Sequence, residues 1–141
     1  GISSLDVLAY NAKNMPTLVC PIRSTNKDTI YAAFYRTENG IFGRVSDYFV
    51  GAIGKLLKMV KEPTVFLGDA ARLYRETIEK TIGSLSVHVD PPENVQRGAV
   101  LAFLAGLHFE RGESDNPLSL EPLYLKEPTA QALLDKEPTG D

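Results

Sequence analysis

The sequence predicts a mixed α/β fold, with helices packed on the faces of a single sheet. The prediction comes from a change in the spacing of apolar residues along the chain. Up to about residue 45, three short runs rich in β-branched and aromatic residues alternate with turn-forming stretches. Beyond that point apolar residues mostly recur at helical spacing, and they are interrupted by a fully apolar run at residues 64–67. The first part therefore supplies antiparallel strands, and the second supplies alternating helices and strands.

Composition sets the protein class. The 141 residues are 43% hydrophobic and 23% charged, which is typical of one globular domain. The net charge of -3 does not favour a nucleic-acid-binding surface. The single cysteine, Cys20, lies in an apolar run and is expected in the core, so no disulfide framework is available and a reducing cytoplasm is the expected location. We find no apolar stretch near the ~20 residues of a membrane span and no signal peptide at the start.

The opening elements follow from local signals. Ser3 or Ser4 can cap a short helix, with Asp6 close to its positive end. Three antiparallel strands are then expected at residues 17–23, 29–36 and 41–45, joined by the polar stretch 24–28 and a turn at 38–40.

The later elements are mainly helices. Ser46 is expected to cap a helix that reaches about Val60, and residues 64–67 form a buried strand. Asp69 is expected to cap the next helix, which ends at Gly83. A short strand at 86–89 precedes a helix from residues 90–92 to about 111. That helix is apolar nearly all round from 99 to 107, so we expect it to be sandwiched.

Four stretches resemble the C-terminal half of the TsaB (YeaZ) family of tRNA threonylcarbamoyladenosine biosynthesis proteins. They are GISSLDVLA at residues 1–9, VCPI with IYAAFYR at 19–36, VFLGDAARLY at 65–74, and LEPLYLK at 120–126, similar to the family's closing EPLYLR. The resemblance implies half of an actin-like ATPase (RNase H-like) fold. Residues 1–125 would form the C-terminal subdomain, with at most a short closing strand at 118–125. Residues 126–141 would form a polar, partly flexible tail, and the family's N-terminal half is missing.

The resemblance also implies a function. The chain would be part of a non-catalytic subunit that supports a TsaD-like catalytic subunit and a TsaE-like ATPase in forming threonylcarbamoyladenosine in tRNA. ATP would be used by the wider complex, no cofactor or metal is expected in this part, and tRNA would be met only indirectly. A second copy is a further candidate partner. The turn at Ser24–Lys27 departs from the family's usual Asp-Ala-Arg-Arg and keeps only the charge of Lys27.

The resemblance to an actin-like fold also implies candidate positions beside its nucleotide cleft, which are Lys27, Gly68 and Asp69. A glycine that follows a strand and begins a helix can present N–H groups to an anion. However, one glycine is fewer than phosphate loops need and Asp69 would repel a phosphate, so an aspartate cap is the favoured interpretation. A nucleotide-binding enzyme remains an alternative.

No catalytic residue is assigned. His88 lies near Asp90 and Glu93, but the two acids have the spacing of a helix capping box, and His108 stands apart. A glycoprotease-type hydrolase is a second alternative, although no G-x-S-x-G motif occurs.

Direct RNA binding is a third alternative. Arg23, Lys27, Arg36 and Tyr35 mix basic and aromatic character near the first hairpin. Tyrosines that alternate along a strand are more typical of sheet packing, which we favour here.

Overall fold

The computed structural model describes residues 1–25, 28–89 and 95–121. Its elements, in chain order, are α1 (Ser4–Tyr10), β1 (Leu18–Ser24), β2 (Ile30–Ala32), β3 (Tyr35–Glu38), β4 (Ile41–Arg44), β5 (Phe49–Gly51), α2 (Ile53–Leu57), β6 (Thr64–Leu67), α3 (Asp69–Leu73), α4 (Arg75–Ile82), the 3-10 turn η1 (Gly83–Leu85), β7 (Ser86–His88) and α5 (Gly98–Glu110). The first helix begins as predicted, because the Ser3 hydroxyl accepts the Leu5 N–H at 3.2 Å.

Strand β1 is the centre of the sheet. On one side it pairs antiparallel with both β2 and β3, Ile22 lying opposite Ala32 and Val19 opposite Tyr35. The two pairings share one register, so β2 and β3 follow each other along the same edge of β1. On its other side β1 pairs parallel with β6, and β6 pairs parallel with β7. The sheet is therefore mixed, with antiparallel strands first, as predicted.

The single strand predicted at residues 29–36 is interrupted. The backbone of Phe34 turns away to other partners: its N–H donates to the Ser46 hydroxyl at 2.9 Å, and its carbonyl accepts the Val45 N–H at 2.8 Å. The break separates β2 from β3. Both halves keep a partner on their outer edge, β5 for β2 and β4 for β3.

The helix predicted from Ser46 to Val60 is wrong in its first half. Ser46 binds Phe34 instead of capping a helix, and Phe49–Gly51 forms strand β5 against β2. Helical spacing of apolar residues is ambiguous over so short a run, and the open edge of β2 supplies hydrogen-bond partners that a helix would leave unused. Only Ile53–Leu57 is helical.

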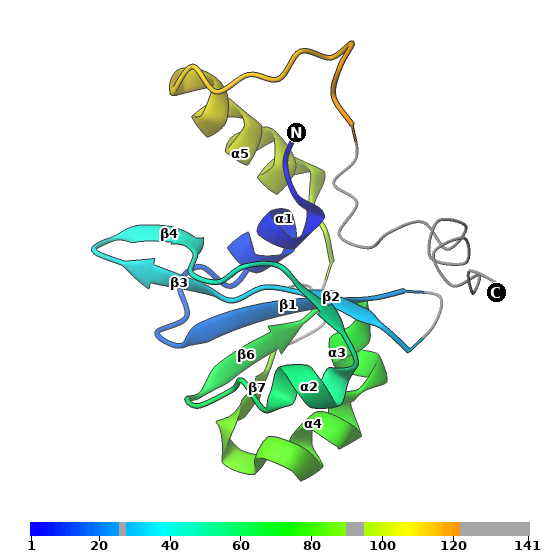
Figure 1. The fold of residues 1–141 in the computed structure, drawn as a ribbon. Coiled ribbons are helices and arrows are strands. Elements are labelled where there is room, and N and C mark those ends of the chain that lie inside the picture. The colour runs from blue at the N-terminus through cyan, green and yellow to red at the C-terminus, as the bar shows by residue number, and fades with distance from the viewer. Residues whose placement is uncertain (26–27, 90–94, 122–141) are drawn as a thin grey trace, which may run out of the picture.

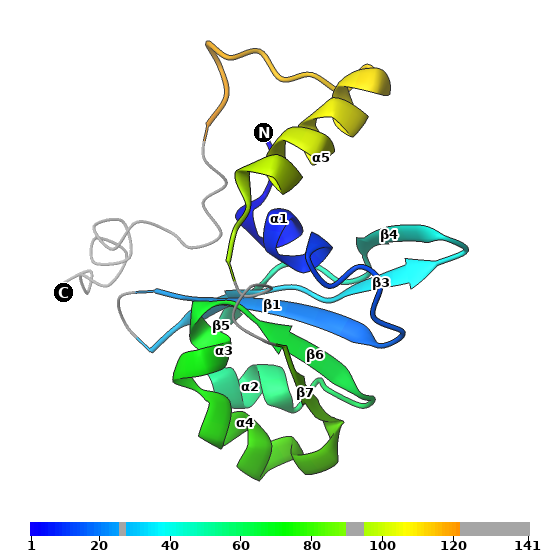
Figure 2. The same ribbon diagram turned by 180° about the vertical axis from the view of Figure 1, so that it is seen from behind.

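Figures 1 and 2 show the sheet lying between two helical layers. On one face α2, α3 and α4 cover a cluster that includes Cys20, Phe66 and Ile78, each at most 1% exposed. On the other face α1 covers a cluster that includes Val19 and Val65. Alternate residues of β1 and β6 thus enter opposite cores, which confirms that 64–67 is a strand buried on both faces.

Helix α5 differs from its prediction in two ways. Residues 95–97 are not helical, so the helix begins at Gly98; the start expected at 90–92 lies outside the described residues. The helix also has no buried residue, so it is not sandwiched. Residues 118–121 form no strand, and the remainder of the expected closing strand and the tail fall outside the described part of the chain.

Candidate functional site

A groove of about 830 Å³ lies where the start of α1 meets the end of β1 and residues 115–121. Because β1 and β6 are parallel, their carboxyl ends lie at the same edge of the sheet, and the end of β1 lines this groove. In α/β sheets this edge is where ligands usually bind. The groove is therefore the candidate functional site.

Gly68 sets the geometry of the turn from β6 into α3. Its φ of +106° is a conformation that residues with a side chain rarely adopt. A Cβ at this position would overlap the carbonyl oxygen of Ile22 and would lie 2.9 Å from Leu8 Cδ2. Glycine is thus required for the close approach of this turn to β1 and α1.

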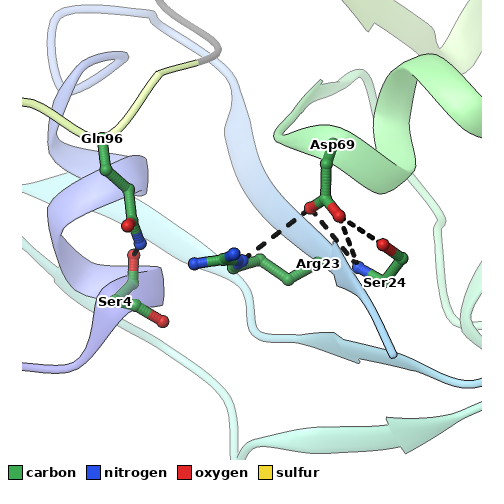
Figure 3. Close-up of polar contacts among 5 residues, drawn as sticks. All are labelled: Ser4, Arg23, Ser24, Asp69 and Gln96. Atoms are coloured by element: carbon green, nitrogen blue, oxygen red, sulfur yellow. Dashed lines mark hydrogen bonds and ion pairs between the residues drawn. The ribbon is translucent and has the colours of Figure 1, made fainter. Parts of the chain in front are cut away.

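Asp69 is not the cap that the sequence predicts. Gly68 occupies the N-cap position, and Asp69 is the first residue of α3. The side chain reaches across to the end of β1, where it accepts the Ser24 N–H at 3.2 Å and the Ser24 hydroxyl proton, and lies 3.8 Å from Arg23 Nε (Figure 3). These contacts fasten the end of β1 to the start of α3.

The side chain of Arg23 extends from this cluster toward Ser4, whose carbonyl oxygen accepts a hydrogen bond from Gln96 Nε2 at 3.0 Å (Figure 3). Arg23 lines the groove together with the carboxylates of Asp6, Asp115 and Glu121. The positive charge of Arg23 is already paired with Asp69, which leaves the groove acidic overall. An acidic groove does not suit a phosphate.

Of the predicted cleft positions, Gly68 and Asp69 lie next to the groove, at the end of β6. Lys27 is outside the described residues. A ligand-binding role for these positions remains a prediction.

The histidines lie on different elements with separate acidic partners. His88 Nε2 on β7 is 3.3 Å from Glu79 Oε1 on α4, without hydrogen-bond geometry. Burial, and then the nearby Arg75, lower the pKa of His88. His108 Nδ1 is 2.7 Å from Glu113 Oε2. The capping-box residues 90 and 93 lie outside the described residues, within which no group of three or more His, Cys, Asp or Glu could hold a metal.

Three of the four predicted RNA-contact residues, Arg23, Tyr35 and Arg36, have partners within the protein, and Lys27 lies outside the described residues. Tyr35 is 2% exposed, and its hydroxyl donates to Asp6 Oδ1 at 2.6 Å. Burial and this hydrogen bond raise the pKa of Tyr35. Arg36 pairs with Glu62 at 2.5 Å. Tyr35 therefore packs in the sheet, which agrees with the favoured interpretation.

Cys20 is fully buried, as predicted, and burial raises the pKa of its thiol. Within the described residues, no helix is both long and apolar enough to span a membrane.

Sequence reasoning missed the link between Asp69 and the Arg23–Ser24 end of β1. A signal was present, since a buried strand at 64–67 paired parallel with 17–23 brings the residues after both strands together. The pairing of Asp6 with Tyr35 joins residues 29 positions apart, and no local pattern indicates it.

Comparison with known proteins finds similarity to TsaB and YeaZ proteins. No protein-family model matches the chain. It is 28% identical over 134 residues to the tRNA threonylcarbamoyladenosine biosynthesis protein TsaB of Bacillus subtilis strain 168. Two solved structures from Pseudomonas aeruginosa, one titled as YeaZ and one as an uncharacterised protein similar to peptidase YEAZ, are each 20% identical to it, with TM-scores of 0.66 and 0.67.

The similarity extends over most of the chain. It covers 93% of the chain in the sequence comparison, and 89% and 88% in the structural ones. The resemblance to TsaB and the actin-like α/β fold predicted from the sequence are thereby confirmed. The chain spans 57% of the length of each of these three proteins, a little over half.

Proposed function

We propose that this chain forms the C-terminal part of a non-catalytic subunit that helps to make threonylcarbamoyladenosine in tRNA, in support of a TsaD-like catalytic subunit. The observation that carries the proposal is the similarity to Bacillus subtilis TsaB over 93% of the chain. In this view the subunit works in the cytoplasm beside a TsaE-like ATPase and meets tRNA only through its partners.

The geometry of the groove supports a structural role for its polar residues. Asp69 accepts hydrogen bonds from the Ser24 N–H and hydroxyl groups, and Arg23 Nε lies 3.8 Å from the same carboxylate. The described lining residues of the groove include no histidine, so Ser24 lacks the Ser–His pair that usually activates a serine nucleophile. The cluster instead joins β1 to α3 and so stabilises the lobe that the subunit contributes.

The proposal is tested in Bacillus subtilis depleted of its own TsaB. The part of that protein matched by this chain is replaced by the chain, and threonylcarbamoyladenosine in total tRNA is measured by mass spectrometry of nucleosides. We expect the hybrid to restore the modified nucleoside and the chain by itself not to do so. A hybrid that accumulates as a folded protein yet leaves the nucleoside absent would contradict the proposal.

A hydrolase is the second candidate, because one of the structural relatives is described by its similarity to a peptidase. Ser24 is the hydroxyl in the groove that is paired with a carboxylate. Hydrolysis of a peptide library by the chain, abolished by Ser24→Ala, would favour this candidate. Tight ATP binding in calorimetry would instead favour a nucleotide-using enzyme. We expect neither.

A further inference from the structure

A second cavity, of about 290 Å³, lies between α1, the β3–β4 hairpin and α5. We call it the aromatic cavity, because the rings of Tyr10, Tyr35, Phe42 and Tyr48 line it. An apolar cavity of about 150 Å³ is enough to hold benzene. The aromatic cavity is therefore large enough for a ligand of about two fused rings.

The walls of the aromatic cavity suit a flat apolar group. The rings of Tyr35 and Phe42 are stacked, with centroids 5.9 Å apart and planes inclined by 13°. Tyr10 meets Phe42 edge to face, also at 5.9 Å. Leu104 and Leu107, both half-buried, line the cavity from α5. An aromatic ligand could stack on these rings or meet them edge to face, as aromatic side chains do in protein cores.

Two arginines add positive charge to the same cavity. Phe42 and Arg44 are two residues apart on β4 and so share one face of the strand. Leu104, Leu107 and Arg111 follow each other at helical spacing, which places them on one side of α5 and its C-cap. Each of the two elements therefore contributes both apolar side chains and a cation.

Both guanidinium groups are available to an anion. The Cζ atom of Arg44 lies 4.2 Å from the centroid of the Tyr48 ring, and its Nη1 donates to the Ser46 carbonyl at 2.6 Å. These contacts hold the guanidinium in place without neutralising its charge. Within the described part of the chain, neither Arg44 nor Arg111 has an ion-pair partner.

The charge of the aromatic cavity is opposite to that of the neighbouring groove. Asp6 is the one carboxylate among the described residues that line the cavity, and its Oδ1 accepts the Tyr35 hydroxyl at 2.6 Å. His108 also lines the cavity, but it faces Glu113 at 2.7 Å. Two arginines against one carboxylate leave a net positive charge, which favours an anionic ligand.

We propose that the aromatic cavity binds a small aromatic carboxylate, with its ring against Phe42 and its carboxylate held by Arg44 and Arg111. The planar guanidinium fork matches the geometry of a carboxylate and can bind it through two hydrogen bonds. The apolar walls strengthen this attraction, because they keep water away from the ion pair. The binding does not depend on the role proposed in tRNA modification.

The test is a titration of 2-naphthoate with the chain, followed by the fluorescence anisotropy of the probe. The chain contains no tryptophan, so indole emission does not interfere. 2-Naphthamide, which has the same rings without the charge, is the matched probe. Arg111→Gln and Arg44→Gln each remove one of the two cations. Arg72→Gln, at an exposed position of α3 on the opposite face of the sheet, is the control variant.

We expect 2-naphthoate to bind saturably and 2-naphthamide to bind more weakly. Arg111→Gln and Arg44→Gln should each weaken the binding of 2-naphthoate by about tenfold, because a charge-assisted hydrogen bond is lost, whereas Arg72→Gln should leave it unchanged.

Three results would overturn the proposal. The first is the absence of saturable binding, and the second is equal affinity for the acid and the amide. The third is an equal loss in the Arg111→Gln and Arg72→Gln variants, since the attraction would then reflect only the overall charge of the protein. A loss with Arg23→Gln but not with Arg111→Gln would also overturn it, because the ligand would then lie in the neighbouring groove.

Discussion

Helices α4 and α5 lie on opposite sides of the same sheet and differ in what they cover. Helix α4 buries Ile78 in the core and turns charged residues outward, where Glu76 pairs with Lys80. Helix α5 buries no residue, and its residues 98–109 include no Asp, Glu, Lys or Arg. An amphipathic pattern thus corresponds to a helix with one protein partner, whereas a pattern that is apolar all round indicates a helix made to meet two. The described chain supplies α5 with one of the two.

The largest contrast should come from truncating one apolar side chain on each helix. Ile78→Ala leaves a cavity in a fully packed site and should lower the free energy of unfolding by about 2–5 kcal/mol. Leu101→Ala removes a side chain that is 45% exposed and should cost less than about 1 kcal/mol. Urea unfolding of both variants measures the difference. Equal losses would show that α5 is as well packed in solution as α4.

A second contrast compares two glycines. Gly68→Ala puts a Cβ against the Ile22 carbonyl at a positive φ and should destabilise the protein by about 1–3 kcal/mol. Gly106→Ala lies within α5, where a Cβ meets nothing within 4 Å, and should stabilise the helix by about 0.5–1 kcal/mol. Opposite shifts in melting temperature are therefore expected. A destabilised Gly106→Ala would mean that the helix already has a close neighbour there.

The smallest expected effect is a loss of folding stability in alkali, caused by the thiol of Cys20 in the well-packed core. Burial raises the pKa of the Cys20 thiol in the folded protein well above 9.0, the ordinary value at which a thiol in the unfolded chain ionises. The unfolded state therefore binds fewer protons in alkali, and stability falls as the pH rises through 9, by about 1 kcal/mol at pH 10. Tyr35, whose pKa is also raised, adds to the fall above pH 10.

The alkaline loss is followed by urea unfolding between pH 8 and 10. Cys20→Ala should remove most of the slope in this range, whatever its effect on stability at pH 8. An unchanged slope in that variant would mean that the thiol is not protected in the folded protein.

Much of the fold could be predicted because its signals are local. The Ser3 cap, the buried run at 64–67 and Gly83 at the end of α4 each depend on neighbouring residues only. The prediction was wrong where pairing partners decide the structure. Phe49–Gly51 fits helical spacing, but it completes the edge of β2, a strand about 20 residues earlier in the chain.

The candidate site was less predictable. Asp69 was identified from sequence as a helix cap, yet its carboxylate binds Ser24, 45 residues away. The contact between Asp69 and Ser24 depends on the parallel pairing of β1 with β6. The apolar pattern of the sequence is compatible with this pairing but does not specify it. The all-round apolar character of α5 was recognised, but the partner expected on its second side is not part of the described chain.

Hydrogen exchange of the chain alone, followed by mass spectrometry at low protein concentration, tests most directly whether α5 lacks a partner. We expect backbone amides of β1, β6 and α4 to exchange slowly, and those of α5 to exchange much faster because one side of the helix is uncovered. Protection of α5 equal to that of β1, and unchanged on further dilution, would contradict the account.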